Sequence, residues 1–373
     1  MLDTPTSLSL AMPFVWSLSF LGGMLCIAIL FTLLSFALHL RNEKKSQAWR
    51  YRENRWNPLL AKVYIQQSPP ETLWKAVQPD EELCFLDYLT QQVNSNSYLW
   101  RWSEHYQKIS VLSAPYLHHI HPHLEHPNAF KRARAVDTLG KLSPELHRPL
   151  LHKALADKDK QVAFVAFRSL IYHASQEDCH LLMAHYGQFS YFQPSYISLL
   201  LSHLPQHIAA VPLISKVLQH KHSQWERIVA LQTLEHYPPM LEHAGPLAAL
   251  AMSKEEKDPL IKGLLLRLLL HWQADDVLKE VIMDFAGDEE DYLRAHAMFA
   301  LGQYPFAHHQ DLLELGLEDA SRWVSLEAAQ SLAYLEAAHA AHTTQASHPH
   351  KSRELSHSLL TYSQYHSQDE VFV

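Results

Sequence analysis

Five histidines lie within residues 118–126, and they are the side chains of this chain with the clearest chemical potential. They are His118, His119, His121, His123 and His126, in the stretch YLHHIHPHLEHPN. Imidazole is a common ligand of transition metals, so several of these rings could share one ion. Pro122 and Pro127 interrupt helical spacing, however, and the stretch contains neither Cys nor Asp. The cluster is a candidate metal site, and the alternative is a chain-wide preference for histidine, of which there are 28.

A second candidate site is acidic. Residues 275–336 contain fourteen acidic and three basic residues, whereas residues 128–170 contain four acidic and nine basic ones. The densest run is Asp288, Glu289, Glu290 and Asp291. A charge run of this kind is usually a solvated face. The functional alternative is that a basic protein surface docks there, because complementary charge sets orientation and association rate.

Signatures of familiar catalytic centres are missing from the sequence. It contains no HExxH, GxSxG or P-loop motif, and nine glycines are few for a nucleotide-binding α/β enzyme. The three cysteines (Cys26, Cys84 and Cys179) form no CxxC pair, which favours a reducing compartment. A net charge of −8 disfavours a nucleic-acid partner. We therefore predict no cofactor and no reaction.

An apolar run near the amino terminus predicts a membrane anchor. The run from Phe14 to Leu38 carries no charge and is long enough to cross a bilayer as a helix. We expect a short extracytoplasmic segment (1–13), a transmembrane helix (14–40) and a basic juxtamembrane segment (41–57). The positive-inside rule then predicts a single-pass protein of the cell (inner) membrane with its amino terminus outside and residues after 57 in the cytoplasm. The predicted membrane-interface residues are Arg41, Lys44, Lys45, Trp49, Arg50, Arg52 and Trp56.

One helical pattern recurs through residues 128–336 at intervals of 30 to 35 residues. It is marked by one leucine per repeat: Leu139, Leu170, Leu204, Leu234, Leu269, Leu301 and Leu332. Alanine stands four positions earlier in five repeats and leucine in two, which predicts a stripe that lets neighbouring helices approach closely. Arg or Lys stands seven positions earlier in four repeats, and an acidic residue often opens the repeat. Proline-containing turns follow the leucine, so each repeat is predicted to be helix, turn, helix.

This pattern resembles the HEAT-repeat (armadillo-like) family, and DEEDYLRAHAMFALG (288–302) and DKDKQVAFVAFRSL (157–170) match it best. The resemblance implies an all-α, right-handed solenoid of about seven helical hairpins, because a single hairpin cannot bury its own apolar face. The third repeat, FQPSYISLLLSHLP, lacks the acidic, Arg and Ala positions. HEAT-like metal hydroxylases hold iron through His-Glu dipeptides, and this chain contains none.

The segments on either side of the repeats lack the pattern. Residues 58–127 read as a helical cap or degenerate repeats, with helices after Pro79 and from Tyr98 to Leu112. The aromatic residues Trp100, Trp102 and Tyr106 are expected to pack in this cap, and the alternative is that they dock a partner. Residues 337–373 are expected to form a flexible, His-rich tail.

Together these features predict a membrane-anchored scaffold or adaptor that binds a membrane-associated protein at the cytoplasmic face. The alternative is an enzyme or enzyme subunit with a site in a concave groove, metal-dependent through residues 118–126. A third reading is regulation of an integral-membrane complex, in which the anchor itself makes helix contacts.

Overall fold

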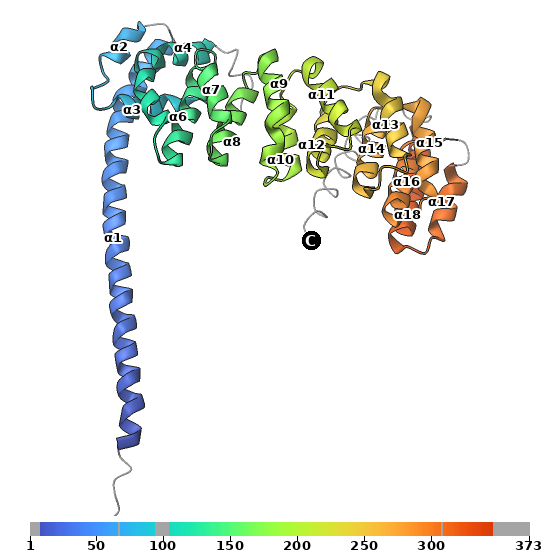
Figure 1. Ribbon diagram of the computed structural model, residues 1–373, viewed down its shortest axis with the longest axis horizontal. Coiled ribbons are helices and arrows are strands. Elements are labelled where there is room, and N and C mark those ends of the chain that lie inside the picture. Colours follow the sequence, from blue (N-terminus) through green and yellow to red (C-terminus); the bar gives the residue numbers. More distant parts are fainter. Residues whose placement is uncertain (1–7, 66–67, 94–103, 307–308, 346–373) are drawn as a thin grey trace, which may run out of the picture. The chain divides into compact units, whose positions relative to one another are not determined.

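The computed structural model describes residues 8–65, 68–93, 104–306 and 309–345, and every regular element in them is a helix (Figure 1). The all-α class predicted from the periodicity is confirmed. The chain divides into two compact units, Met1–Leu146 and His147–Val373. The first unit therefore contains the residues of the predicted anchor, the predicted cap and the first helix of the predicted repeat array.

The first unit consists of one long helix and several short ones. They are α1 (Leu8–Tyr64), α2 (Pro70–Trp74), α3 (Glu82–Gln92), α4 (Glu104–Ser113), the 3₁₀ helix η2 (Ala114–Ile120), α5 (His121–Leu124) and α6 (Ala129–Leu142). Within the described residues, α1 is the one helix long and apolar enough to cross a membrane, with a mean hydropathy of 2.2 in its most apolar window. The segments expected at 14–40 and 41–57 belong to this single helix without a break.

The carboxyl end of α1 is part of the core of the first unit. Trp56, Leu60 and Val63 are 0–5% exposed, and they recur at the spacing of one helix face. Pro58 lies inside the same helix, although proline has no N–H to donate and normally weakens a helix. Burial of this face on both sides of Pro58 accounts for the continuation of the helix to Tyr64. The boundary expected between residues 57 and 58 is therefore not a break in the structure.

The second unit consists of consecutive helices joined by turns. They are α7 (Arg148–Leu155), α8 (Lys160–Ile171), α9 (Gln176–His185), η3 (Tyr186–Phe189), α10 (Pro194–Leu201), α11 (Gln206–Leu218), α12 (Gln224–Leu234), η4 (Leu241–His243), α13 (Ala244–Ala251), α14 (Pro259–His271), α15 (Asp275–Ala286), α16 (Asp291–Gln303), α17 (His309–Leu317) and α18 (Arg322–Gln345).

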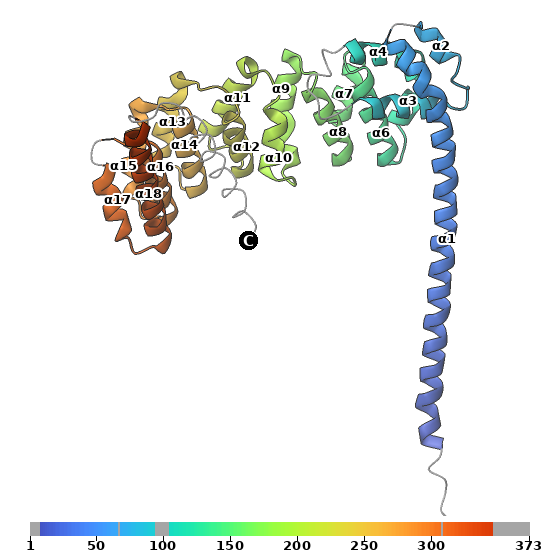
Figure 2. The same cartoon turned by 180° about the vertical axis from the view of Figure 1, so that it is seen from behind.

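These helices form two rows within the second unit. Each even-numbered helix from α8 to α18 contacts the next even-numbered one, and α9, α11, α13 and α15 contact one another in the same way (Figures 1 and 2). Helices that are consecutive in sequence, such as α15 and α16, also pack together. The core therefore lies between the two rows, and it extends from hairpin to hairpin.

The predicted repeat register agrees with the burial of the side chains. Six of the seven marked leucines are 0–2% exposed: Leu139, Leu170, Leu204, Leu234, Leu269 and Leu301. The seventh, Leu332 in α18, is half-buried. All seven residues four positions earlier are buried: Ala135, Ala166, Leu200, Ala230, Leu265, Ala297 and Ala328. In the third repeat Leu204 lies after the end of α10, yet it remains buried.

The end of the repeat region differs from the sequence prediction. We expected a flexible tail from residue 337, but α18 continues through Gln345. Alanine-rich sequence after Glu336 has high helix propensity, which explains why the helix continues beyond the last marked leucine. The rest of the predicted tail, 346–373, lies outside the described residues, as do residues 1–7 at the other end.

Candidate interaction surface

The five clustered histidines lie on short elements and do not converge on one point. They are His118 and His119 in η2, His121 and His123 in α5, and His126 after α5. No group of three His, Cys, Asp or Glu side chains that could hold a metal ion occurs in the part of the chain that the structure describes. The prolines that interrupt helical spacing explain this dispersal, because they end one short helical turn and begin another.

His119 and His126 make contacts with neighbouring elements. His119 Nε2 lies 2.6 Å from the Glu82 carboxylate at the start of α3. His126 Nδ1 accepts a hydrogen bond of 3.0 Å from the N–H of Asn128, the residue that caps α6. These contacts tie η2 and the α5–α6 turn to neighbouring elements, which is a structural role.

The acidic run lies at the start of α16, and its four members differ in their surroundings. Asp288 is half-buried; its carboxylate accepts the Glu290 N–H at 2.9 Å and lies 3.9 Å from Lys262 Nζ. Asp291 accepts a hydrogen bond of 2.9 Å from the Ser321 hydroxyl. Glu289 and Glu290 are exposed. Asp288 is thus part of the packing between α14 and α16, and Glu289, Glu290 and Asp291, which are exposed, are the members that a partner can reach.

The predicted aromatic docking residues of the cap are only partly described. Trp100 and Trp102 lie outside the described residues. Tyr106 is in α4, but its side chain lies outside them as well. Their proposed packing or docking role stays a prediction.

The predicted membrane-interface residues divide into two groups. Arg41, Lys44, Lys45 and Arg50 are exposed on α1, and Trp49 is half-buried. Arg52 Nε instead donates to Glu81 at 3.0 Å, and Trp56 is 0% exposed. The assignment of Trp56 to the membrane interface is therefore wrong. Its ring packs against Phe85 and Tyr88, with centroids 5.2 and 5.3 Å apart, because α3 folds back on α1.

A buried carboxylate joins α1 to the turn before α3. Glu81 is 5% exposed and accepts hydrogen bonds from the guanidinium groups of Arg52 and Arg55. Burial acts to raise the pKa of Glu81, but the bonds from the two arginines outweigh it, and the pKa lies below its usual range. Nearby, the Tyr88 hydroxyl donates to Asn57 Oδ1 at 2.6 Å. The last turns of α1 are thereby fixed to the other helices of the first unit.

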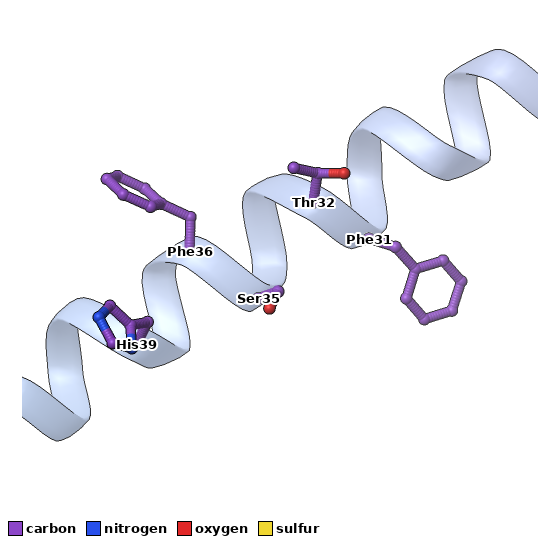
Figure 3. Close-up of a pocket in the computed structure, with 5 residues that line it drawn as sticks. All are labelled: Phe31, Thr32, Ser35, Phe36 and His39. Atoms are coloured by element: carbon purple, nitrogen blue, oxygen red, sulfur yellow. The ribbon is translucent and has the colours of Figure 1, made fainter.

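The apolar part of α1 has a different kind of surface. Thr32, Ser35 and His39 recur at intervals of three and four residues, with Phe31 and Phe36 beside them (Figure 3). The shallow surface around them is lined by side chains of α1 itself. The Thr32 hydroxyl donates to the Ala28 carbonyl at 2.8 Å, so it is satisfied within the helix. This surface contains no enclosed pocket for a small ligand.

A partly exposed apolar surface crosses three neighbouring helices of the second unit, and its central side chains, Tyr292 and His296, are half-buried. We call it the apolar row, and it consists of Leu260 of α14, Tyr292, His296 and Phe299 of α16, and Trp323 and Leu326 of α18. The Tyr292 ring lies 4.2 Å from the His296 ring and 5.9 Å from the Trp323 ring, measured between centroids. Phe299, Trp323 and Leu326 are 39%, 46% and 52% exposed. Exposed apolar surface that is continuous across several elements marks interaction sites.

Close approach of α14 and α16 positions the centre of the apolar row. A Cβ added to Gly263 would lie 2.8 Å from the Tyr292 ring, so the glycine makes room for that ring. Burial raises the pKa of Tyr292 and lowers the pKa of His296. Both side chains are therefore neutral at pH 7, and this part of the surface is apolar as well as aromatic.

The sequence contained a signal for the apolar row that periodic analysis of the core did not use. Leu260, Tyr292 and Trp323 each stand nine positions before a marked leucine, in the first turn of an even-numbered helix. Trp225 occupies the same position in α12, where its Nε1 donates to the Phe192 carbonyl at 3.0 Å. Four successive repeats therefore have a large apolar side chain at the same position on their surface. Such a recurrence indicates a face shared by the repeats and not a scatter of unrelated exposed residues.

Comparisons with known proteins identify no family for the chain. No protein-family model matches it, and no curated protein matches it. Among solved structures, human deoxyhypusine hydroxylase in complex with glycerol is similar at 15% identity and a TM-score of 0.29, over 68% of this chain and 97% of that chain.

Proposed function

We propose that this chain is a single-pass, membrane-anchored adaptor whose HEAT-like α-solenoid holds a protein partner at the cytoplasmic face of the cell membrane. The partner is itself membrane-associated, so the adaptor can regulate an integral-membrane complex. Stacked hairpins suit this role because they offer a long binding surface on a stable scaffold.

One observation carries the proposal: the apolar helix runs without interruption into a folded core. Trp56 and Leu60 of α1 are buried in the first unit, and Glu81 binds two arginines of the same helix. A cleaved leader would be followed by a processing site and not by a helix whose next turns complete the core. The continuity supports a retained anchor, and it would keep the first unit close to the bilayer.

Charge supports the orientation. Residues 41–56 contain six basic and two acidic residues, whereas residues 1–13 contain one acidic and no basic residue. Short basic flanks stay on the cytoplasmic side of a membrane, so the helical units face the cytoplasm. Confinement to the same surface as the partner raises the effective concentration of both, and a modest interface then suffices.

Topology can be tested with reporters fused after Val373. A reporter that is active only in the cytoplasm should function there, and one that requires export should not. The opposite pair of results would place the helical units outside the cytoplasm and contradict the proposal.

The adaptor role can be tested by retention of partners from solubilised membranes after mild crosslinking. The comparison uses the full chain and a version in which residues 14–38 are replaced by an unrelated transmembrane helix of equal length. The two versions should retain the same protein, because the helical units make the contact. If neither retains any protein above the level of an unrelated membrane-anchored control, the adaptor role is wrong. If only the native anchor retains it, α1 makes the contact.

A further inference from the structure

We infer that the apolar row, together with the acidic residues beside it, binds a segment of a second protein that carries clustered Arg or Lys residues among apolar side chains. This inference rests on the proposed adaptor function, and it names the surface and the chemistry of the partner.

The apolar row presents large side chains away from the buried faces of its helices. Trp323 and Leu326 lie one turn apart on α18, on the side opposite to the buried Val324, Ala328 and Ser331. Tyr292 and Phe299 extend the same surface onto α16, where they are seven residues apart. Tyr292 is half-buried and packs against α14 at Gly263. Phe299, Trp323 and Leu326 are exposed and lie outside the buried face that packs between helices. They are available to bury the apolar side chains of another chain.

Acidic residues lie next to the apolar row. Glu289, Glu290 and Asp291 immediately precede Tyr292, so they lie at the end of the row where α16 begins. Glu290 is the residue before the first turn, and its side chain makes no capping hydrogen bond. The nearby cation Arg294 is neutralised by Asp319, which accepts two hydrogen bonds from it. Arg267, whose charge acts on Tyr292 and His296, pairs with Glu235, and Arg322 is exposed next to Trp323. The exposed carboxylates Glu289, Glu290 and Asp291 outnumber these two cations, so the start of α16 is the acidic end of the row.

The combination of aromatic rings and carboxylates selects the chemistry of the ligand. An aromatic face attracts a guanidinium or ammonium group, and an adjacent carboxylate pairs with it. Tyr292, Trp323 and the exposed glutamates supply both types of group within one surface. Nucleic acid and anionic lipid headgroups would be repelled by residues 275–336, which have fourteen acidic and three basic residues. A basic and apolar polypeptide segment is the class of ligand that satisfies both halves of the site.

The test uses the full chain in phosphatidylcholine nanodiscs and a labelled twelve-residue peptide of alternating arginine and leucine. Fluorescence anisotropy at low salt measures its Kd, and empty nanodiscs give the background. The same peptide with glutamate in place of arginine should bind at least about tenfold more weakly. Trp323→Ala should raise the Kd for the basic peptide by about tenfold, because an aromatic anchor is lost.

Charge variants separate local binding from general attraction to an acidic protein. Glu289→Lys with Glu290→Lys should slow association by about tenfold at low salt, and the difference should shrink as salt rises. The matched control is Asp276→Lys with Glu280→Lys, which makes the same charge change on exposed residues of α15, in the other row of helices. The control should stay within about twofold of the parent. All variants change exposed side chains, so their helical melting should match that of the parent.

Several results would overturn the inference. Equal Kd values for the parent and Trp323→Ala would remove the apolar row from the site, and equal effects of the two charge pairs would show nonspecific attraction. Tighter peptide binding after removal of residues 346–373 would show that the chain's own carboxyl-terminal segment occupies the row. If the peptide assay fails while the full chain still retains its partner from membranes, only this inference is wrong. If partner retention itself fails, the adaptor function is wrong.

Discussion

The Arg294 guanidinium donates two hydrogen bonds to the Asp319 carboxylate, at 2.7 and 3.0 Å, and two more to the carbonyls of Asp288 and Glu289, both at 2.9 Å. One side chain of α16 therefore binds both the turn before its own helix and the turn before α18. This explains why an arginine and an acidic residue at the start of the repeat recur in the sequence, since the two residues join one repeat to the next.

The same relationship occurs at other repeats. Arg227 pairs with Glu256, which lies in the turn before α14, and its Nε donates to the Val217 carbonyl at 3.0 Å. Lys262 of α14 lies 3.9 Å from Asp288, which precedes α16. The cation is always seven positions before a marked leucine. The recurring ion pairs thus fix the register of neighbouring hairpins in the second unit.

Arg294→Ala should lower the free energy of unfolding by about 2 kcal/mol, because the Asp319 carboxylate and two turn carbonyls lose their donor at a largely buried position. Chemical denaturation followed by circular dichroism measures the change. Arg267→Ala is the control. Arg267 also binds a carboxylate, Glu235 at 2.6 Å, but its side chain is 48% exposed, so its loss should cost less than about 1 kcal/mol. Equal losses for the two variants would contradict the role given to Arg294.

Asp319 should make the fold sensitive to acid. The hydrogen bonds from Arg294 lower the pKa of Asp319 below its usual value, so the unfolded chain binds the proton first as pH falls. Its contribution to stability is fully present above the unfolded pKa of about 3.9, and it is lost as pH falls through the lower folded pKa. Asp319→Asn should destabilise the chain at pH 7 and narrow the difference in stability between pH 7 and pH 3. An unchanged difference would show that Asp319 does not contribute to the acid response.

Leu234→Asp tests the repeat register. Leu234 is 0% exposed, and an aspartate there would place a carboxylate without a partner between packed helices, at a cost of several kcal/mol. The control is Leu241→Asp in η4, where the leucine is 57% exposed and the change should cost under about 0.5 kcal/mol. If both variants melt within a degree or two of the parent, the side chain of Leu234 does not lie in the core and the register is wrong.

The core of the repeats could be predicted because each position has the same surroundings in every hairpin. A small residue and a leucine one turn apart meet the next helix each time, so Ala297 and Leu301 repeat the environment of Ala230 and Leu234. Leu332 departs from this, because α18 ends the row of even-numbered helices within the described residues. Contacts between segments distant in sequence could not be predicted in this way. The repeat pattern gave no indication that α3 would fold onto α1. Trp56, which lies in the basic segment, was therefore assigned to the membrane interface.

The apolar row was missed for a related reason. Periodic analysis selects residues that face the core, and Tyr292 and Trp323 lie on the outer surface of their helices. Their common position becomes visible only when the repeats are aligned on the marked leucine. The acidic residues were easier to find in the sequence, but the sequence did not indicate that their roles differ. Asp288 faces Lys262 of the neighbouring helix, and only the packing of α14 against α16 reveals this.

The junction between anchor and first unit yields the last prediction. A fragment of residues 46–345 keeps the buried Trp56 and the bonds from Arg52 and Arg55 to Glu81, and it should be monomeric, helical and cooperatively folded. A fragment that begins at Asn57 lacks all three side chains. It should lose about 3–5 kcal/mol from the missing Trp56 alone, and Glu81 would remain buried without its cations.

Two single changes in the longer fragment separate these effects. Trp56→Ala should cost about 3–5 kcal/mol, because the space beside Phe85 and Tyr88 would be left empty. Trp49→Ala is the matched control, since Trp49 lies two turns earlier on α1 and is only half-buried, and it should cost under about 1 kcal/mol. Equal stability of the two fragments, or equal costs for the two tryptophans, would show that the anchor helix is not part of the core. The first unit would then be joined to the membrane by a flexible connection, and its distance from the bilayer would not be fixed by the fold.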